Sequence, residues 1–126
     1  MKEKCLIAVD WDCTLYYYDY DKPVKIELQD VIPLSKESIL RWIKAGHKVY
    51  ICSAKADSEE NISKMRVKLD ADGLSKVKTV TNKKLPDTDY LIDDIAVHVC
   101  PNEGFKEYIV PTAYDHEYAT AAKSRF

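Results

Sequence analysis

The chain has 126 residues, of which 46% are hydrophobic and 32% charged, and its formal net charge is −2. This balance is typical of one soluble domain, and we expect residues 1–126 to form a single domain with its own core. The small net charge argues against general binding to nucleic acids, and the absence of a long apolar stretch argues against a membrane span. Because the apolar run near the N-terminus is too short for a signal peptide, we expect a cytoplasmic protein.

The four cysteines do not form a C-x-x-C pair; they are Cys5, Cys13, Cys52 and Cys100. Zinc sites usually show paired ligand spacing, and disulfides are rare in the cytosol. We therefore expect most of these cysteines to be small buried side chains rather than bridges or metal ligands.

In the first half of the chain, a short strand is followed by a long connection, a helix and a second strand. Residues 5–9 form a continuous apolar run, which is typical of a buried parallel strand. Residues 16–33 are polar and rich in tyrosine. Ser35 then looks like the N-cap of a helix that stops at Gly46, and residues 48–53 predict the second strand.

The second half continues the alternation. Asp57 or Ser58 is expected to cap a second helix that ends near Gly73. The remaining expected elements are strands at 77–81, 89–93, 97–99 and 108–110 and an alanine-rich closing helix at 114–124.

Strands that alternate with helices indicate a parallel sheet covered on both faces. We therefore predict an α/β fold, a Rossmann-like three-layer sandwich with a central, mainly parallel sheet. Ligands of such sheets bind at the carboxyl ends of the strands, so the polar residues at those ends deserve closest inspection.

Acidic, hydroxyl and lysine side chains follow the predicted strands in a definite order. They are Asp10, Asp12 and Thr14 after the first strand, Ser53 at the end of the second, the Lys83-Lys84 pair before the fourth, and Asp93-Asp94 at its end. The carboxyl ends of parallel strands share one edge of a sheet, so these side chains should converge. Each is ordinary alone, but together they predict a site.

These residue types suit phosphoryl transfer. Phosphate esters are anionic, so an attacking carboxylate needs positive charge beside it. Mg²⁺ supplies it and prefers carboxylate oxygens, and lysine adds a further charge on the phosphoryl oxygens. One carboxylate can attack the phosphorus, while a second, two residues away, protonates the leaving oxygen and later activates water.

In these motifs the sequence resembles the haloacid dehalogenase superfamily of phosphatases. The first motif of that family is an apolar strand followed by Asp-x-Asp-x-Thr, here residues 10–14. The second is a strand ending in Ser53, the third a lysine, and the fourth a strand ending in Asp93-Asp94. Residues 80–86 are similar to small phage and bacterial members.

The resemblance implies a role for each matching residue. Asp10 would be the nucleophile and a metal ligand. Asp12 would be the general acid/base, with its backbone carbonyl on the metal. Thr14 would bind phosphate and support the loop, and Ser53 would bind the phosphoryl group. Lys84 would bind it too, with Lys83 as the alternative lysine. Asp93 and Asp94 would bind Mg²⁺.

Two features of the chain bear on these roles. Cys13 stands where the family usually has glycine, which puts the geometry of the loop in question. Both positions at which family members insert a cap domain, residues 16–33 and the segment after Ser53, are short. We therefore expect an open site without a substantial cap.

A cluster of tyrosines follows the first motif: Tyr16, Tyr17, Tyr18 and Tyr20. Tyrosine rings at the mouth of a site can stack a nucleobase. The alternative is that they pack the connection against the body of the protein. The same loop is also a candidate contact in an oligomer.

The resulting hypothesis is a magnesium-dependent phosphomonoesterase that forms an aspartyl-phosphate. Its small phosphorylated substrate is a nucleotide, a polynucleotide end or a sugar phosphate. The alternative is a catalytically weak or inactive module of the same fold, which Cys13 favours. A response-regulator receiver domain fits less well, because its acidic pair comes first in the chain, whereas here Asp93-Asp94 comes last.

Overall fold

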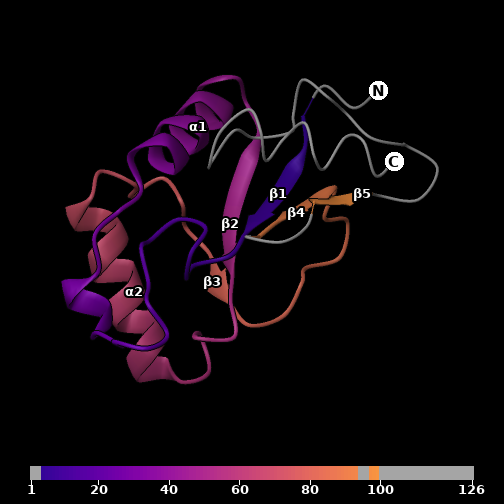
Figure 1. Ribbon diagram of the computed structural model, residues 1–126. Coiled ribbons are helices and arrows are strands. Elements are labelled where there is room, and N and C mark those ends of the chain that lie inside the picture. Colours follow the sequence, from indigo (N-terminus) through magenta and orange to yellow (C-terminus); the bar gives the residue numbers. More distant parts are fainter. Residues whose placement is uncertain (1–3, 94–96, 100–126) are drawn as a thin grey trace.

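The computed structural model describes residues 4–93 and 97–99. A five-stranded sheet with the order β3-β2-β1-β4-β5 forms its centre (Figure 1). β1 to β4 are parallel, and β5 pairs antiparallel with β4. The predicted class, an α/β Rossmann-like fold with a mainly parallel sheet, is therefore confirmed. The elements are β1 (Leu6–Val9), the 3₁₀ helix η1 (Ile26–Leu28), α1 (Pro33–Lys44), β2 (Lys48–Cys52), α2 (Glu59–Ala71), β3 (Val80–Thr81), β4 (Tyr90–Ile92) and β5 (Val97–Val99).

β1 is the central strand of the sheet. Its residues are almost all buried, because β2 and β4 flank it on both edges and side chains cover both of its faces. The register places Ile7 beside Val49 on one side and Tyr90 on the other. The residue that follows β1, Asp10, is thereby set between the ends of two neighbouring strands.

The two helices α1 and α2 pack on the same face of the sheet. One continuous core joins Ile7 of β1 and Val49 of β2 to Ile39 of α1 and Met65 of α2. This follows from topology, since the crossovers from β1 to β2 and from β2 to β3 run in the same direction, and right-handed crossovers then lie on one side. In Figure 1 both helices lie to the left of the strands. The predicted sandwich has three layers, and the described residues supply two of them: the sheet and one layer of helices.

The start of α1 differs from the sequence prediction. Ser35 does not cap the helix but lies buried within it, and its hydroxyl donates a hydrogen bond to the carbonyl of Thr14. The helix begins at Pro33, because the fixed φ of proline suits the first helical position and its missing N–H is not needed there. The predicted end is right: Gly46 has φ +98°, and the N–H of His47 donates to the carbonyl of Trp42.

The remaining boundaries are close to those expected. Ser58, rather than Asp57, caps α2 by accepting a hydrogen bond from the N–H of Asn61 at 3.1 Å. β3 is shorter than predicted, since Val77 lies buried in the turn that precedes it. The predicted strand at 108–110 and helix at 114–124 lie outside the described residues.

None of the helices in the described part of the chain combines the length and the hydrophobicity needed to cross a membrane.

Candidate active site

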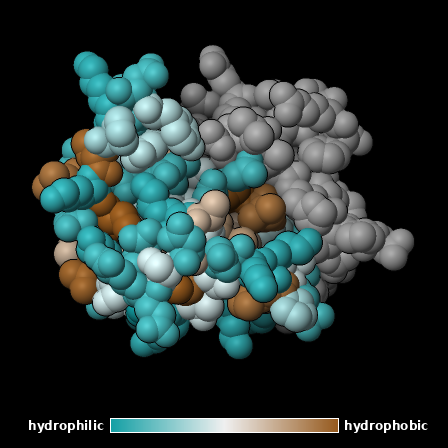
Figure 2. Space-filling model, turned by 90° about the horizontal axis from the view of Figure 1, so that it is seen from below, coloured by the Kyte–Doolittle hydropathy of each residue, from teal (hydrophilic) through white to brown (hydrophobic). Residues whose placement is uncertain are grey.

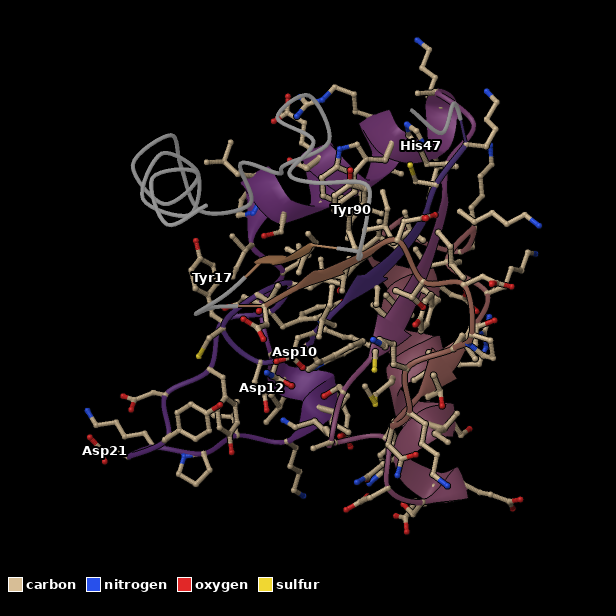
Figure 3. All side chains as sticks on the ribbon, turned by 90° about the vertical axis from the view of Figure 1, so that its right-hand side faces the viewer. Asp10, Asp12, Tyr17, Asp21, His47 and Tyr90 are labelled. Atoms are coloured by element: carbon tan, nitrogen blue, oxygen red, sulfur yellow. The ribbon has the colours of Figure 1, made fainter. Side chains whose placement is uncertain are left out.

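Asp10 lies directly after β1, at the edge of the sheet where the parallel strands end. Its backbone N–H donates to the carbonyl of Ile92 at the end of β4 (2.9 Å), and its Oδ1 accepts a hydrogen bond from the N–H of Trp11 (2.7 Å). In Figure 3, Asp10 and Asp12 lie near each other, and His47 lies at the opposite end of the strands. A pocket of about 220 Å³ opens beside Asp10 and is lined by Asp10, Cys52, Ser53, Ala54, Asn82, Leu91 and Asp93. Figure 2, which views the molecule from below, shows a mainly hydrophilic surface at this edge.

The Asp10 carboxyl is held in a partly buried, negatively charged environment. Burial raises the pKa of Asp10 above its ordinary value, and the nearby carboxylates of Asp93 and Asp12 raise it further. Hydrogen bonds from the Trp11 N–H and the Ser53 hydroxyl act in the opposite direction. Like charges gathered in this way are unfavourable unless a cation or a proton compensates them.

Ser53 is the second predicted residue that the structure places at Asp10. It is buried, with 6% exposure, and its hydroxyl is hydrogen-bonded to the Asp10 carboxylate. Its backbone N–H donates to the carbonyl of Thr81 in β3 (2.9 Å), which fixes the end of β2. The hydroxyl therefore lines the same pocket as the proposed nucleophile.

Asp12 is bound by two residues that the sequence prediction missed. Its Oδ1 accepts hydrogen bonds from Lys55 Nζ at 2.8 Å and from Gln29 Nε2 at 2.9 Å. Lys55 follows Ser53 by two residues, so the strand-end argument that selected Ser53 could also have selected it. Gln29 lies in the long connection before α1, where no motif or periodicity distinguishes it.

Thr14 does not line the pocket. Its side chain is fully buried, and its Oγ1 has no hydrogen-bond partner among the described residues. Its backbone carbonyl accepts the hydrogen bond from Ser35, which ties the loop to α1. This placement fits the expected role of Thr14 in supporting the loop, and phosphate binding by Thr14 stays a prediction.

The loop that carries the two candidate lysines is anchored to β2. The Tyr50 hydroxyl accepts a hydrogen bond from the N–H of Leu85 (2.9 Å) and is hydrogen-bonded to Thr88 Oγ1 (2.6 Å). Both lysine side chains are exposed. Burial and Asp10 raise the pKa of the Cys52 thiol, which lines the pocket, and the charge of Lys84 lowers it. The choice between Lys84 and Lys83 as the site lysine stays a prediction.

A cation at this edge would have oxygen ligands. Asp93 lies in the same pocket as Asp10, and Asp94 lies outside the described residues. Within residues 4–93 and 97–99, no three His, Cys, Asp or Glu side chains are grouped to hold a metal ion. Two carboxylates, those of Asp10 and Asp93, do line the same pocket, and carboxylate oxygens are the ligands that a hard cation such as Mg²⁺ prefers.

Cys13, which stands where glycine was expected, has an unusual backbone conformation. Cys13 has φ +64°, in the left-handed region that favours glycine. Its N–H donates to the carbonyl of Tyr16 (2.8 Å), and its Sγ contacts the carbonyl of Tyr18 (3.3 Å). The loop therefore adopts a conformation that favours glycine, and cysteine carries the steric cost.

Replacing this residue by glycine should stabilise the protein. The left-handed conformation costs a non-glycine residue roughly 1–2 kcal/mol, and the greater unfolded-state freedom of glycine offsets part of the gain. We expect Cys13→Gly to raise the free energy of unfolding by about 1 kcal/mol in urea denaturation. Cys13→Ala, which removes the thiol but keeps Cβ, is the matched control and should give no such gain. Equal stability of the two variants would contradict the argument.

The tyrosine cluster divides into a buried and an exposed part. Tyr16 is fully buried, stacks on Trp11 with ring centroids 4.2 Å apart, and donates to Asp72 Oδ2 (2.8 Å), so it packs the loop against the body. Tyr17 and Tyr20 are 56% and 71% exposed. Packing thus accounts for Tyr16, while exposed rings remain on the outer part of the loop.

Among the described residues Cys5 is buried, as expected, whereas Cys13 and Cys52 are partly buried; Cys100 lies outside.

Comparisons of this chain with protein-family models, with curated proteins and with solved structures gave no match. The case for its function therefore depends on the residues and their geometry.

Proposed function

We propose that the chain is a magnesium-dependent phosphomonoesterase that uses Asp10 as its nucleophile. One observation carries the proposal: at the carboxyl edge of the sheet, Asp10 shares a pocket with a hydroxyl that is hydrogen-bonded to its carboxylate, Ser53, and with a second acid, Asp93. A half-buried carboxylate that lies in a pocket and whose pKa is raised is a candidate catalytic group, because such a group does not stabilise the fold.

In the proposed reaction, an oxygen of Asp10 attacks the phosphorus, and the bond to the leaving oxygen breaks on the opposite side. Asp12 gives a proton to that oxygen, so an alcohol departs and an aspartyl-phosphate remains. Asp12 then takes a proton from water, which attacks the phosphorus and releases inorganic phosphate and free Asp10. Ser53 donates a hydrogen bond to the phosphoryl group, and Lys84 contributes positive charge from its exposed loop.

Mg²⁺, held by the side chains of Asp10 and of the Asp93-Asp94 pair and by the Asp12 carbonyl, would neutralise the charges that otherwise repel the substrate.

A second candidate function is a non-catalytic module. The observation in its favour is that the Asp12 carboxylate is already engaged by Lys55 and Gln29. The intact set of Asp10, Ser53 and Asp93 in one pocket argues for the enzyme.

The test is hydrolysis of p-nitrophenyl phosphate and of a panel of nucleotides, sugar phosphates and phosphorylated oligonucleotide ends. We expect phosphate release that needs added Mg²⁺ and stops with a chelator. The panel also ranks the three substrate classes. If Mg²⁺ binds but no phosphate ester is hydrolysed, the module is the better description.

A further inference from the structure

We propose that Lys55 and Gln29 are positioning residues that fix the Asp12 carboxylate for proton transfer. They bind Asp12 through Oδ1, and the other oxygen, Oδ2, carries the proton to and from the leaving group. This inference rests on the proposed function and adds two residues and one atom assignment to it.

The contacts to Asp12 are one-sided. Lys55 Nζ and Gln29 Nε2 both donate to Oδ1, at 2.8 and 2.9 Å. Among the described residues, no hydrogen bond reaches Oδ2. Asp12 and Lys55 are only 15% and 16% exposed, so the ion pair is better shielded than a surface pair. One oxygen is thus anchored while the other is left for substrate.

The orientation of the Gln29 amide follows from its neighbours. Gln29 is 1% exposed, and its Oε1 accepts from Trp11 Nε1 (2.8 Å), which can only donate. Its Nε2 then faces two acceptors, Asp12 Oδ1 and the carbonyl of Tyr17 (3.1 Å). Turning the amide over would place donor against donor and acceptor against acceptor. The hydrogen-bond network therefore specifies that Gln29 donates to Asp12.

Lys55 is held from three sides. Its Nζ contacts Asp12 Oδ1, lies 3.4 Å from Gln29 Oε1, and sits 4.2 Å from the ring centroid of Tyr18. Its backbone carbonyl accepts from Asn61 Nδ2 of α2 (3.1 Å). A long side chain with every donor directed loses little further freedom when the substrate binds, which suits a group that orients another.

The proposal predicts a dependence on the leaving group. An alkoxide is a poor leaving group and needs a proton as the bond breaks, whereas p-nitrophenolate leaves readily without one. A general acid contributes on the order of 10²–10⁴-fold to such a step. Loss of its orientation should therefore slow the first step, formation of the aspartyl-phosphate, strongly for alkyl phosphates and weakly for p-nitrophenyl phosphate.

The experiment compares Lys55→Met with the wild type on both substrate types in saturating Mg²⁺. We expect kcat/KM, which reports the chemistry up to departure of the leaving group and not the later hydrolysis of the aspartyl-phosphate, to fall about 100-fold on an alkyl phosphate and less than about fivefold on p-nitrophenyl phosphate. Lys55→Arg, which keeps the charge and the donors, should recover most of the loss. Lys64→Met is the matched control, because within the described part of the chain Lys64 forms an ion pair with exposed Glu60 of α2 and none with Asp12. Lys55→Gln, which keeps a donor, replaces Lys55→Met if that variant does not fold.

Each outcome decides the matter. Equal losses of kcat/KM on both substrates would mean that Lys55 only supports the structure or binds the substrate; either overturns the proposal. Activity that survives in Asp10→Asn refutes the proposed nucleophile but leaves the leaving-group test of Lys55 intact. A wild type inactive on every phosphate ester overturns both.

Discussion

Asp10→Asn should reduce magnesium-dependent phosphate release by about 10³-fold or more, because the amide cannot form the aspartyl-phosphate. The substitution changes little else. The Asn carbonyl oxygen can still accept the hydrogen bond from the Trp11 N–H, and the backbone N–H of residue 10 still donates to Ile92. The measurement is initial rates of phosphate release with a fixed Mg²⁺ concentration for both proteins.

Asp21→Asn is the matched control for this loss. Asp21 is exposed and lies on the outer part of the connecting loop, away from Asp10 (Figure 3). We expect its rate to stay within about twofold of the wild type, as for most surface substitutions away from a site. Comparable rates in the two variants would show that another group attacks the phosphorus.

The Asp10→Asn variant should also be more stable than the wild type at neutral pH. The pKa of Asp10 is raised in the folded protein from the ordinary value of 3.8. A group with a raised pKa contributes stability below its unfolded pKa, and this is lost as the pH rises through the folded pKa. In metal-free buffer, Asp10→Asn should therefore melt higher at pH 7, and the difference should disappear as the pH falls below 3.8. The Asp10 carboxylate, the proposed nucleophile, would in this respect destabilise the fold.

Trp11→Ala should destabilise the protein by about 3–5 kcal/mol, the range found when large aromatic side chains are removed from a core. Trp11 is fully buried, stacks on Tyr16, and donates its indole N–H to Gln29. Its loss would leave a cavity and an amide oxygen with fewer donors. Urea denaturation followed by circular dichroism measures the change.

The control for Trp11 is Val67→Ala on α2. Val67 is 67% exposed, so its truncation creates no cavity, and alanine has a slightly higher helix propensity than valine. We expect a change within about 0.5 kcal/mol. If Trp11→Ala were equally mild, the loop between the two aspartates would not be part of the core.

Much of the fold was predictable because the signals are local. The apolar run of β1, the glycines that end both helices and the alternation of strand and helix identify the class without tertiary information. Ser35 shows the limit: a serine after Pro33 looks like a cap, but its hydroxyl finds the carbonyl of Thr14 across the fold. Such a contact depends on where the loop lies, and local sequence does not encode that.

The site shows the same division. Asp10, Ser53 and Asp93 were predictable because each directly follows a strand of one parallel sheet. Gln29 was not, because it reaches Asp12 only after the connection folds over Trp11. Thr14 matches the motif, yet its side chain is buried and does not line the pocket, which sequence alone did not reveal.

The position of β4 has a consequence for how the molecule assembles. β1 and β2 can pair early, but β4 joins β1 from far along the chain: the N–H of Leu6 bonds Asp89 across a separation of 83 residues. Closing so long a loop is slow relative to local pairing. The carboxylate of Asp93 therefore reaches Asp10 only when the sheet is nearly complete, and protection of the Asp10 amide against hydrogen exchange should be among the last to develop on refolding.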